Sequence, residues 1–203
     1  AVLVFVMFTS GSLIEVLDNS EVMVIQSLFS GDLTWHTTPG PKWQGFGKVT
    51  RYEKRAQFWF SNKEDDANTP AIETLFNDGA RARIDGSFSW DMPTDLENLT
   101  EIHTKYASQH WVEQELLKTL INKTVYMTGP LMSSAESYAS RRNELLSAIN
   151  DQMMYGVYRT TAADEKIKDP MTGQEKTARV VKLVKEEDGR IAREDKSPLQ
   201  DFG

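Results

Sequence analysis

Histidine and carboxylate side chains are the first candidates for chemistry in this sequence. Three histidines occur, at His36, His103 and His110, and the last two are seven residues apart across a predicted helix break. This spacing gives no metal-binding arrangement. The acidic run Glu64-Asp65-Asp66 lacks the spaced oxygen ligands and the sharp glycine of a calcium loop. We therefore expect the histidines to be polar surface or strand residues and the acidic run to be a solvated loop.

Motifs for nucleophilic or phosphate chemistry are weak or missing. Gly45-Phe46-Gly47 lacks the third glycine and the strand-then-helix context of a phosphate-binding loop. No serine or threonine lies in a nucleophile-elbow sequence, and no Ser-x-x-Lys or Lys-Thr-Gly box occurs. Cysteine is absent, which excludes disulfides, thiolate catalysis and cysteine-ligated metal. The sequence predicts no catalytic, cofactor or metal site, although a site assembled from distant residues stays open.

The composition limits the class of protein. With 203 residues, the chain can bury about 70% of the surface that its unfolded form exposes, in one domain or two small ones. The formal net charge is -7, the sequence pI is about 5.1, and the basic residues are interleaved with acidic ones. Because no basic stripe is present to attract phosphates, we expect no nucleic-acid partner.

The first eight residues form an apolar stem. A helix needs about 20 apolar residues to cross a bilayer, so the stem cannot span one alone. Two interpretations remain open: the stem is the end of a membrane span whose earlier part lies outside the sequence, or it is a buried β-strand. No secretory signal peptide with a basic start is visible. In the first interpretation, the anchor residues are Val2, Leu3, Val4, Phe5, Val6, Met7 and Phe8.

Short strands separated by turn residues are predicted in the first half. Val22–Phe29 and Leu33–Thr37 can pair as a hairpin around Ser30-Gly31-Asp32, because glycine tolerates the positive φ of a tight turn. The prolines that follow at 39 and 41 stop this pairing, since proline has no N–H to donate to a ladder. Two more segments have strand patterns, one rich in aromatic residues and one alternating, at Lys48–Phe60 and Ala80–Trp90.

After Met92-Pro93-Thr94 the apolar residues recur with a helical period. Ser133 and Glu136 have the spacing of a capping box, which begins a helix that continues to about Met154. Two helices are expected before it and three strands after it, at Asp95–Tyr106, Gln109–Tyr126, Val157–Thr161, Lys176–Lys185 and Arg190–Glu194. The fold class is therefore α+β: a β-rich first half, helices between, and β again at the end.

The order of these elements and several short boxes resemble a known family. The boxes of the first half are Glu21-Val22-Met23-Val24-Ile25, the loop at Gly31, the Pro39-Gly40 turn and Arg51-Tyr52-Glu53-Lys54-Arg55-Ala56-Gln57. Those of the helical part are Ser133-Ser134-Ala135-Glu136-Ser137-Tyr138, Arg141-Arg142 and Glu144-Leu145 through Ile149. They are similar to the SPFH (Band 7) domain that stomatins, prohibitins, flotillins and the bacterial HflK/HflC pair share. The resemblance covers roughly Leu13 to the end of the chain.

The resemblance implies an SPFH-type fold in three parts: the end of a membrane anchor at residues 1–8, a β-rich first subdomain at 9–93 and an α/β second subdomain at 94–203. The sequence departs from the family at Pro41-Lys42-Trp43-Gln44-Gly45, where family members often place an aromatic residue and then proline. The hairpin from Lys166 to Lys176 is longer than we expect. Family members usually continue into a long coiled coil, which is absent or trimmed after Gly203.

The resemblance also implies a function. Family members are membrane-anchored scaffolds whose copies pack into a ring or cage, and they organise a membrane microdomain or restrain an enclosed membrane protein or protease. The implied partners are a lipid bilayer and identical or homologous subunits, with no enzyme activity and no cofactor. Exposed aromatic side chains of the first half would lie at the membrane interface, with Trp35, Trp43 and Phe46 as candidates. Packing in the core is the alternative for these aromatic residues.

The expected location is a membrane, reached by a single pass or a monotopic anchor. No lysine or arginine precedes Lys42, whereas four acidic residues do, which slightly favours a non-cytoplasmic domain by the positive-inside tendency. Two other classes of function remain open. One is a soluble adaptor that binds a protein through a sheet edge, and the other is a hydrolase with a dispersed site.

Overall fold

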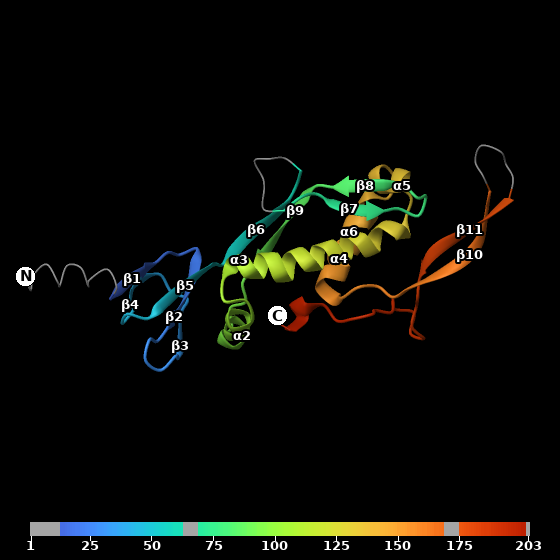
Figure 1. Cartoon of the computed structure of the whole chain (residues 1–203). Helices are drawn as coiled ribbons and strands as arrows, with labels where there is room; N and C mark the ends of the chain where they lie inside the picture. Colours follow the sequence, from blue (N-terminus) through green and yellow to red (C-terminus); the bar gives the residue numbers. More distant parts are fainter. Residues whose placement is uncertain (1–12, 63–68, 169–174, 202–203) are drawn as a thin grey trace, which may run out of the picture. The chain divides into compact units, whose positions relative to one another are not determined.

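The computed structural model of the chain describes residues 13–62, 69–168 and 175–201 (Figure 1). The stem at 1–8, the acidic run at 64–66 and the turn expected at 169–173 lie outside the described residues, so these predictions stay predictions. The described residues form a mixed α+β chain with a strand-rich first region, then helices, then closing strands. This coarse α+β order was predicted from the sequence.

Two compact units can be distinguished by their internal contacts. Unit 1 comprises residues 1–58, 88–116 and 202–203, and unit 2 comprises 59–87 and 117–201. The chain passes from one unit to the other after residues 58, 87 and 116, so neither unit is one continuous segment. The division at residue 93 stays a prediction. Each unit is described by itself below.

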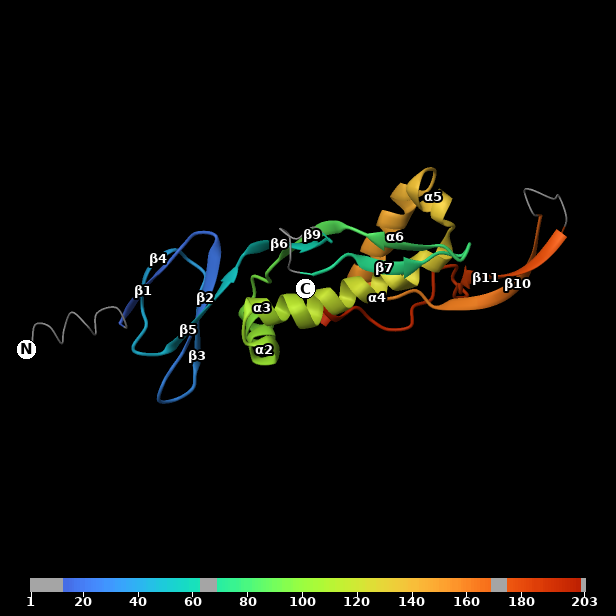
Figure 2. The same ribbon diagram turned by 45° about the horizontal axis from the view of Figure 1, so that its top comes forward.

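Unit 1 is built on two small antiparallel sheets, which both ribbon views show at the N-terminal end of the described chain (Figures 1 and 2). One sheet pairs β1 with β4, and the other has the order β3-β2-β5. These strands are β1 (Ile14–Leu17), β2 (Glu21–Gln26), β3 (Leu33–His36), β4 (Gly40–Trp43) and β5 (Lys48–Glu53). The hairpin of β2 and β3 was predicted, whereas the pairing of β1 with β4 was not.

The predicted strand Val22–Phe29 ends earlier than expected, at Gln26. The next residues form a turn because Ser27 donates its backbone N–H to Asp32 O at 2.9 Å and accepts the N–H of Gly31 at 3.0 Å. Gly31 has a φ of 76°, which suits glycine. Leu28 and Phe29 therefore lie in this turn and not in the strand, and both side chains are exposed.

The helices of unit 1 follow the predicted pattern with one change. The first, α2 (Leu96–Tyr106), has Asp95 as its N-cap, whose carboxylate accepts the backbone N–H of Asn98 at 2.9 Å. The predicted helix Gln109–Tyr126 is instead three successive segments: α3 (Gln109–Trp111), a π-helical turn η2 (Val112–Leu117) and α4 (Lys118–Thr128). The last of these segments ends at Thr128, two residues after the predicted end at Tyr126.

Four strands carry the chain through the middle of the sequence. They are β6 (Arg55–Phe60), β7 (Ile72–Leu75), β8 (Arg81–Ile84) and β9 (Gly86–Asp91), and they pair as β6 with β9 and β7 with β8. The predicted strand Lys48–Phe60 is thus divided into β5 and β6, and the predicted strand Ala80–Trp90 into β8 and β9. The expected alternation in the second segment is present, because its even-numbered residues are the less exposed ones.

Helix α4 lies against β7 and α6 (Arg142–Tyr155) in unit 2. Its buried side chains include Leu120, Ile121 and Val125, and the backbone carbonyl of Val125 accepts the Thr74 hydroxyl of β7 at 3.1 Å. Gly129, which follows α4, lies so close to Thr74 that a Cβ atom there would clash with its side chain. The absence of a side chain at residue 129 therefore allows the end of α4 to approach β7.

The predicted single helix from Ser133 to Met154 is two helices, α5 (Ser134–Tyr138) and α6. The capping box is present: the Ser133 hydroxyl accepts the N–H of Glu136, whose carboxylate accepts the N–H of Ser133 at 2.9 Å. After α5, the backbone N–H of Arg141 bonds Glu136 O at 2.8 Å, and Ala139 leaves the helical conformation. Helical periodicity alone could not reveal this break.

The described closing part of the chain has two strands where three were expected, and the first of them is longer than predicted. Strand β10 (Thr160–Lys168) pairs antiparallel with β11 (Glu175–Leu183) in a two-stranded ribbon, which appears in orange in Figures 1 and 2. The predicted strands at 157–161 and 190–194 contribute isolated bridges, Tyr158 with Arg193 and Lys185 with Ile191. A short 3-10 turn, η4 (Pro198–Asp201), follows.

Gln152 connects three parts of unit 2 by buried hydrogen bonds. It is fully buried on α6, and its side-chain amide donates to the Thr128 hydroxyl of α4 at 2.6 Å. Its side-chain oxygen accepts the backbone N–H of Tyr158 at 3.1 Å. Because buried polar groups cost free energy unless they are paired, this one side chain fixes the end of α4, α6 and the start of the closing strands.

We predict that Gln152→Met, which keeps the length of the side chain, lowers the free energy of unfolding by about 1 to 3 kcal/mol. The physical reason is that the buried N–H of Tyr158 loses its acceptor. Urea denaturation measures the change, with Gln200→Met as the control at an exposed position. An equal effect of the two substitutions would contradict the role of Gln152.

Candidate lipid-facing surface

The ribbon of β1 and β4 has one buried face and one exposed face, and both carry apolar side chains. Ile14 lies directly opposite Trp43, and Val16 directly opposite Pro41, so these four side chains share a face. Val16 is 64% exposed and Trp43 67%. Leu17, on the other face, is buried. An exposed face made wholly of apolar side chains is unusual for a strand ribbon in water.

The orientation of this ribbon is fixed from its buried side. Leu17 packs with Met23 and Ile25 of β2 in a small core cluster. The Arg51 guanidinium lies between two carboxylates, at 2.6 Å from Glu15 of β1 and 3.1 Å from Glu21 of β2. Glu15 and Leu17 therefore hold one face of β1 against the three-stranded sheet, and Ile14 and Val16 must point the other way.

Phe46 extends the exposed apolar face beyond the end of β4. The backbone N–H of Gln44 donates to Leu13 O at 2.7 Å, and the N–H of Gly47 closes a turn onto Gln44 O at 3.0 Å. Within this turn Phe46 has a φ of 62°, in the left-handed region, and its side chain is 50% exposed. A phenylalanine at a strained backbone position with an exposed ring is uncommon.

The turn after β2 lies at the same end of unit 1. Gly47 is adjacent to Ile25 and Gln26, since a Cβ atom on Gly47 would come within 2.6 Å of Gln26 O. The turn that contains Leu28 and Phe29 begins directly after Gln26. Phe29 is 92% exposed, the highest value among the exposed large apolar side chains of the described residues.

We call the exposed apolar side chains of β1, β4 and the turns after β2 and β4 the apolar surface of unit 1, which consists of Ile14, Val16, Leu28, Phe29, Pro41, Trp43 and Phe46. Trp43 and Phe46 were named as interface candidates from the sequence; both are exposed, and their place at a membrane interface stays a prediction. Leu28 and Phe29 were missed because they were assigned to a strand. The available signal was an apolar pair followed by Ser30-Gly31-Asp32, which are turn residues.

The third predicted interface residue, Trp35, has a different environment. It is half-buried on β3, and its indole N–H donates to the Thr100 hydroxyl of α2 at 3.0 Å. Its ring also contacts those of Tyr52 and His103, with centroids 6.1 and 5.9 Å away. Trp35 therefore contributes to packing between β3 and α2, and we do not include it in the apolar surface.

His103 is part of this packing and not the surface polar residue that the sequence predicted. The Tyr52 hydroxyl and His103 Nδ1 are hydrogen-bonded at 2.7 Å. Burial lowers the pKa of His103, and the positive charge of Lys48 lowers it further. Burial also raises the pKa of Tyr52 to about 12. Both groups are therefore neutral at neutral pH, and their hydrogen bond joins α2 to β5.

Metal-binding clusters are absent among residues 13–62, 69–168 and 175–201. This part of the chain holds no group of three or more histidine, aspartate and glutamate residues placed to bind a metal ion. Across the same residues, no helix combines the length and the apolar character that crossing a membrane requires. The predicted anchor at Val2–Phe8 lies outside the described residues.

Comparison with known proteins gives no further assignment. No protein-family model matches the chain, and no curated protein matches it. The resemblance to SPFH domains therefore rests on the residues quoted above.

The pH dependence of the free energy of unfolding tests the hydrogen bond between Tyr52 and His103. Because burial and Lys48 hold the pKa of His103 in the folded state below its usual value of 6.5, the stabilising contribution of the neutral imidazole is complete above about pH 6.5. It is lost progressively as the pH falls below that value, since the unfolded chain then binds the proton more strongly. We predict that the wild type loses more stability between pH 7.5 and pH 5 than His103→Gln, which cannot titrate. Urea midpoints at the two pH values measure this, and equal losses would contradict the assignment.

Proposed function

We propose that the chain is a membrane-anchored scaffold of the SPFH type. In this proposal the stem at residues 1–8 anchors the chain, the apolar surface of unit 1 lies on the bilayer, and identical or homologous copies pack side by side around a membrane microdomain. The proposal depends on where the apolar surface lies along the chain. It begins at Ile14, directly after the apolar stem and the short polar segment Thr9–Ser12. A side chain that is costly in water gains free energy when lipid covers it.

The chemistry of the apolar surface favours lipid at the interfacial region. Tryptophan and phenylalanine are well suited to this region because their rings are large and apolar, and Trp43 also has a polar N–H. Unit 1 carries eleven aspartate and glutamate residues against six lysine and arginine residues, so it has net negative charge. Anionic lipids would repel such a unit, and the contact must therefore be apolar in origin.

A soluble adaptor that binds a protein partner through a sheet edge is the second candidate. It is supported by the ribbon of β10 and β11, whose described strands pair only with each other and so leave strand edges open. Membrane binding distinguishes the two candidates, since an adaptor of this kind needs no bilayer.

We predict that replacing two rings of the apolar surface weakens binding of the full chain to phosphatidylcholine vesicles. In Trp43→Thr with Phe46→Asn, threonine suits the strand position and asparagine tolerates the left-handed φ at residue 46. Loss of two half-exposed rings from the lipid contact should weaken binding about tenfold or more. Sedimentation of the protein with vesicles measures the partition.

Trp59→Thr is the matched control, because it removes an exposed tryptophan from β6 in unit 2. It should bind vesicles as the wild type does. The proposal fails if the double variant and the control bind equally, or if the wild type does not sediment with vesicles. Circular dichroism of all three proteins checks that each is folded.

A further inference from the structure

Unit 2 has a groove of about 500 Å³ beside the junction of α5 and α6. Glu144, Ser147 and Ala148 of α6 line one wall, at helical spacing and with two small side chains in the middle. Val181 and Leu183 of β11 line the opposite wall. This volume lies in the range of sites that hold a large side chain or a small ligand.

The groove is lined by both apolar and cationic residues. Leu131 and Ile191 add to the apolar residues of β11, and the cationic residues Arg141, Lys182 and Lys185 also line the groove. Among the residues that line it, Glu144 carries the one carboxylate.

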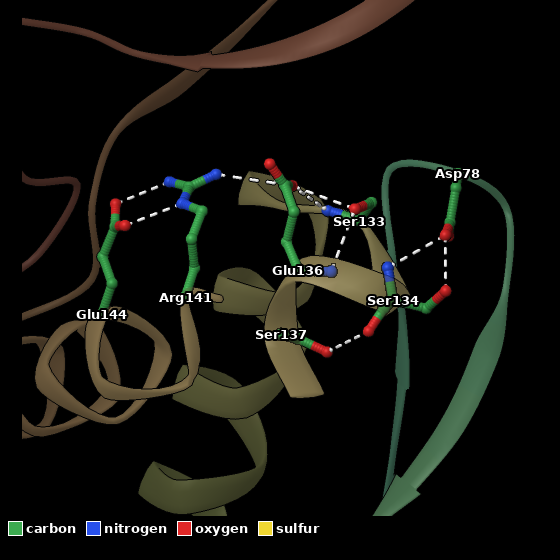
Figure 3. A network of polar contacts seen from close by, with 7 residues as sticks. All are labelled: Asp78, Ser133, Ser134, Glu136, Ser137, Arg141 and Glu144. Atoms are coloured by element: carbon green, nitrogen blue, oxygen red, sulfur yellow. Dashed lines mark hydrogen bonds and ion pairs between the residues drawn. The ribbon is translucent and has the colours of Figure 1, made fainter. Parts of the chain in front are cut away.

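That carboxylate is already engaged. Its two oxygens accept from Arg141 at 2.6 and 2.7 Å, and Figure 3 shows the Arg141 guanidinium between Glu144 and Glu136. Arg141 and Glu144 neutralise each other, so Lys182 and Lys185 give the lining of the groove its net positive charge, which suits an acidic and apolar occupant.

The polar network of Figure 3 connects α5, which precedes the groove residues of α6, to the turn between β7 and β8. Ser134 donates its backbone N–H to the Asp78 carboxylate at 2.9 Å, so the start of α5 is fixed to the turn between β7 and β8. The hydrogen bonds from Ser134, together with that of Ala80, lower the pKa of Asp78, which keeps this carboxylate charged.

Unit 1 has side chains whose charge and apolar character match those of the groove. It has five more acidic than basic residues, eleven against six, and carries most of the negative charge of the chain. Trp111 of α3 and Glu115 of η2 are both exposed and are four residues apart on continuous helical backbone, so they lie near each other on one face. A tryptophan beside a carboxylate matches a groove lined by apolar and cationic residues, and tryptophan is the residue type most enriched at the centres of protein interfaces.

We propose that the groove of unit 2 receives Trp111 and Glu115 from unit 1 of a second copy of this chain. Trp111 lies on the apolar residues of the groove, and Glu115 pairs with Lys185. The two patches are different surfaces of the same chain, so the contact is head-to-tail and generates a ring when the rotation between copies closes. This inference rests on the side-by-side packing in the proposed function and names the contact that produces it.

A charge exchange tests the contact in the full chain bound to phosphatidylcholine vesicles. Lys185→Glu and Glu115→Lys each place like charges opposite one another, which should raise the protein concentration for half-maximal assembly about tenfold or more. The double variant restores the pair with reversed sign and should return to within about twofold of the wild type. Chemical cross-linking followed by gel analysis measures assembly at each concentration.

Lys196→Glu makes the same charge change at an exposed position of unit 2 outside the groove and is the control. The inference is overturned if the single variants assemble like this control, or if the double variant is no better than either single variant. Assembly of the wild type with no effect of these variants would leave lateral packing in place and point to another occupant of the groove. A wild type that binds vesicles but never assembles would overturn both this contact and lateral packing, while the lipid contact of unit 1 is measured separately.

Discussion

Unit 1 buries one face of the β1–β4 ribbon and leaves the other, apolar face exposed. Side chains alternate along a strand, so the buried position of Leu17 and the ion pair of Glu15 with Arg51 fix which way Ile14 and Val16 point. A slip of one residue would exchange the two faces. The core of unit 1 thus determines the exposed apolar face. That exposed apolar face is the observation on which the proposed contact with lipid rests.

The two units leave different kinds of surface uncovered. In unit 1 the polar and aromatic groups around Tyr52 and His103 bond to one another, and large apolar side chains remain exposed. Unit 2 also exposes large apolar side chains, among them Leu146 and Met154, but it differs in having a groove that is lined in part by Arg141 and two lysines. One protein with an apolar surface, an acidic unit and a cationic groove has the complementary parts that a membrane-bound array of identical copies requires.

Local signals in the sequence predicted much of the secondary structure. The capping box of Ser133 and Glu136 depends on residues within one turn, and it is present. Features that depend on distant partners were missed. The pairing of β1 with β4 and the contact of His103 with Tyr52 each need residues that the sequence pattern does not bring together. For the candidate surface, Trp43 and Phe46 were identified by residue type, whereas Leu28 and Phe29 required the turn geometry.

The most direct test of the account is the depth of the apolar surface in a bilayer. The chain has no cysteine, so Phe29→Cys and Trp59→Cys each give one site for a nitroxide spin label. With the full chain on phosphatidylcholine vesicles, the account predicts that the label at residue 29 is reached by oxygen dissolved in lipid and shielded from a water-soluble nickel complex. The label at residue 59 should show the opposite accessibility. Equal access of the nickel complex to both labels would contradict a lipid-facing unit 1.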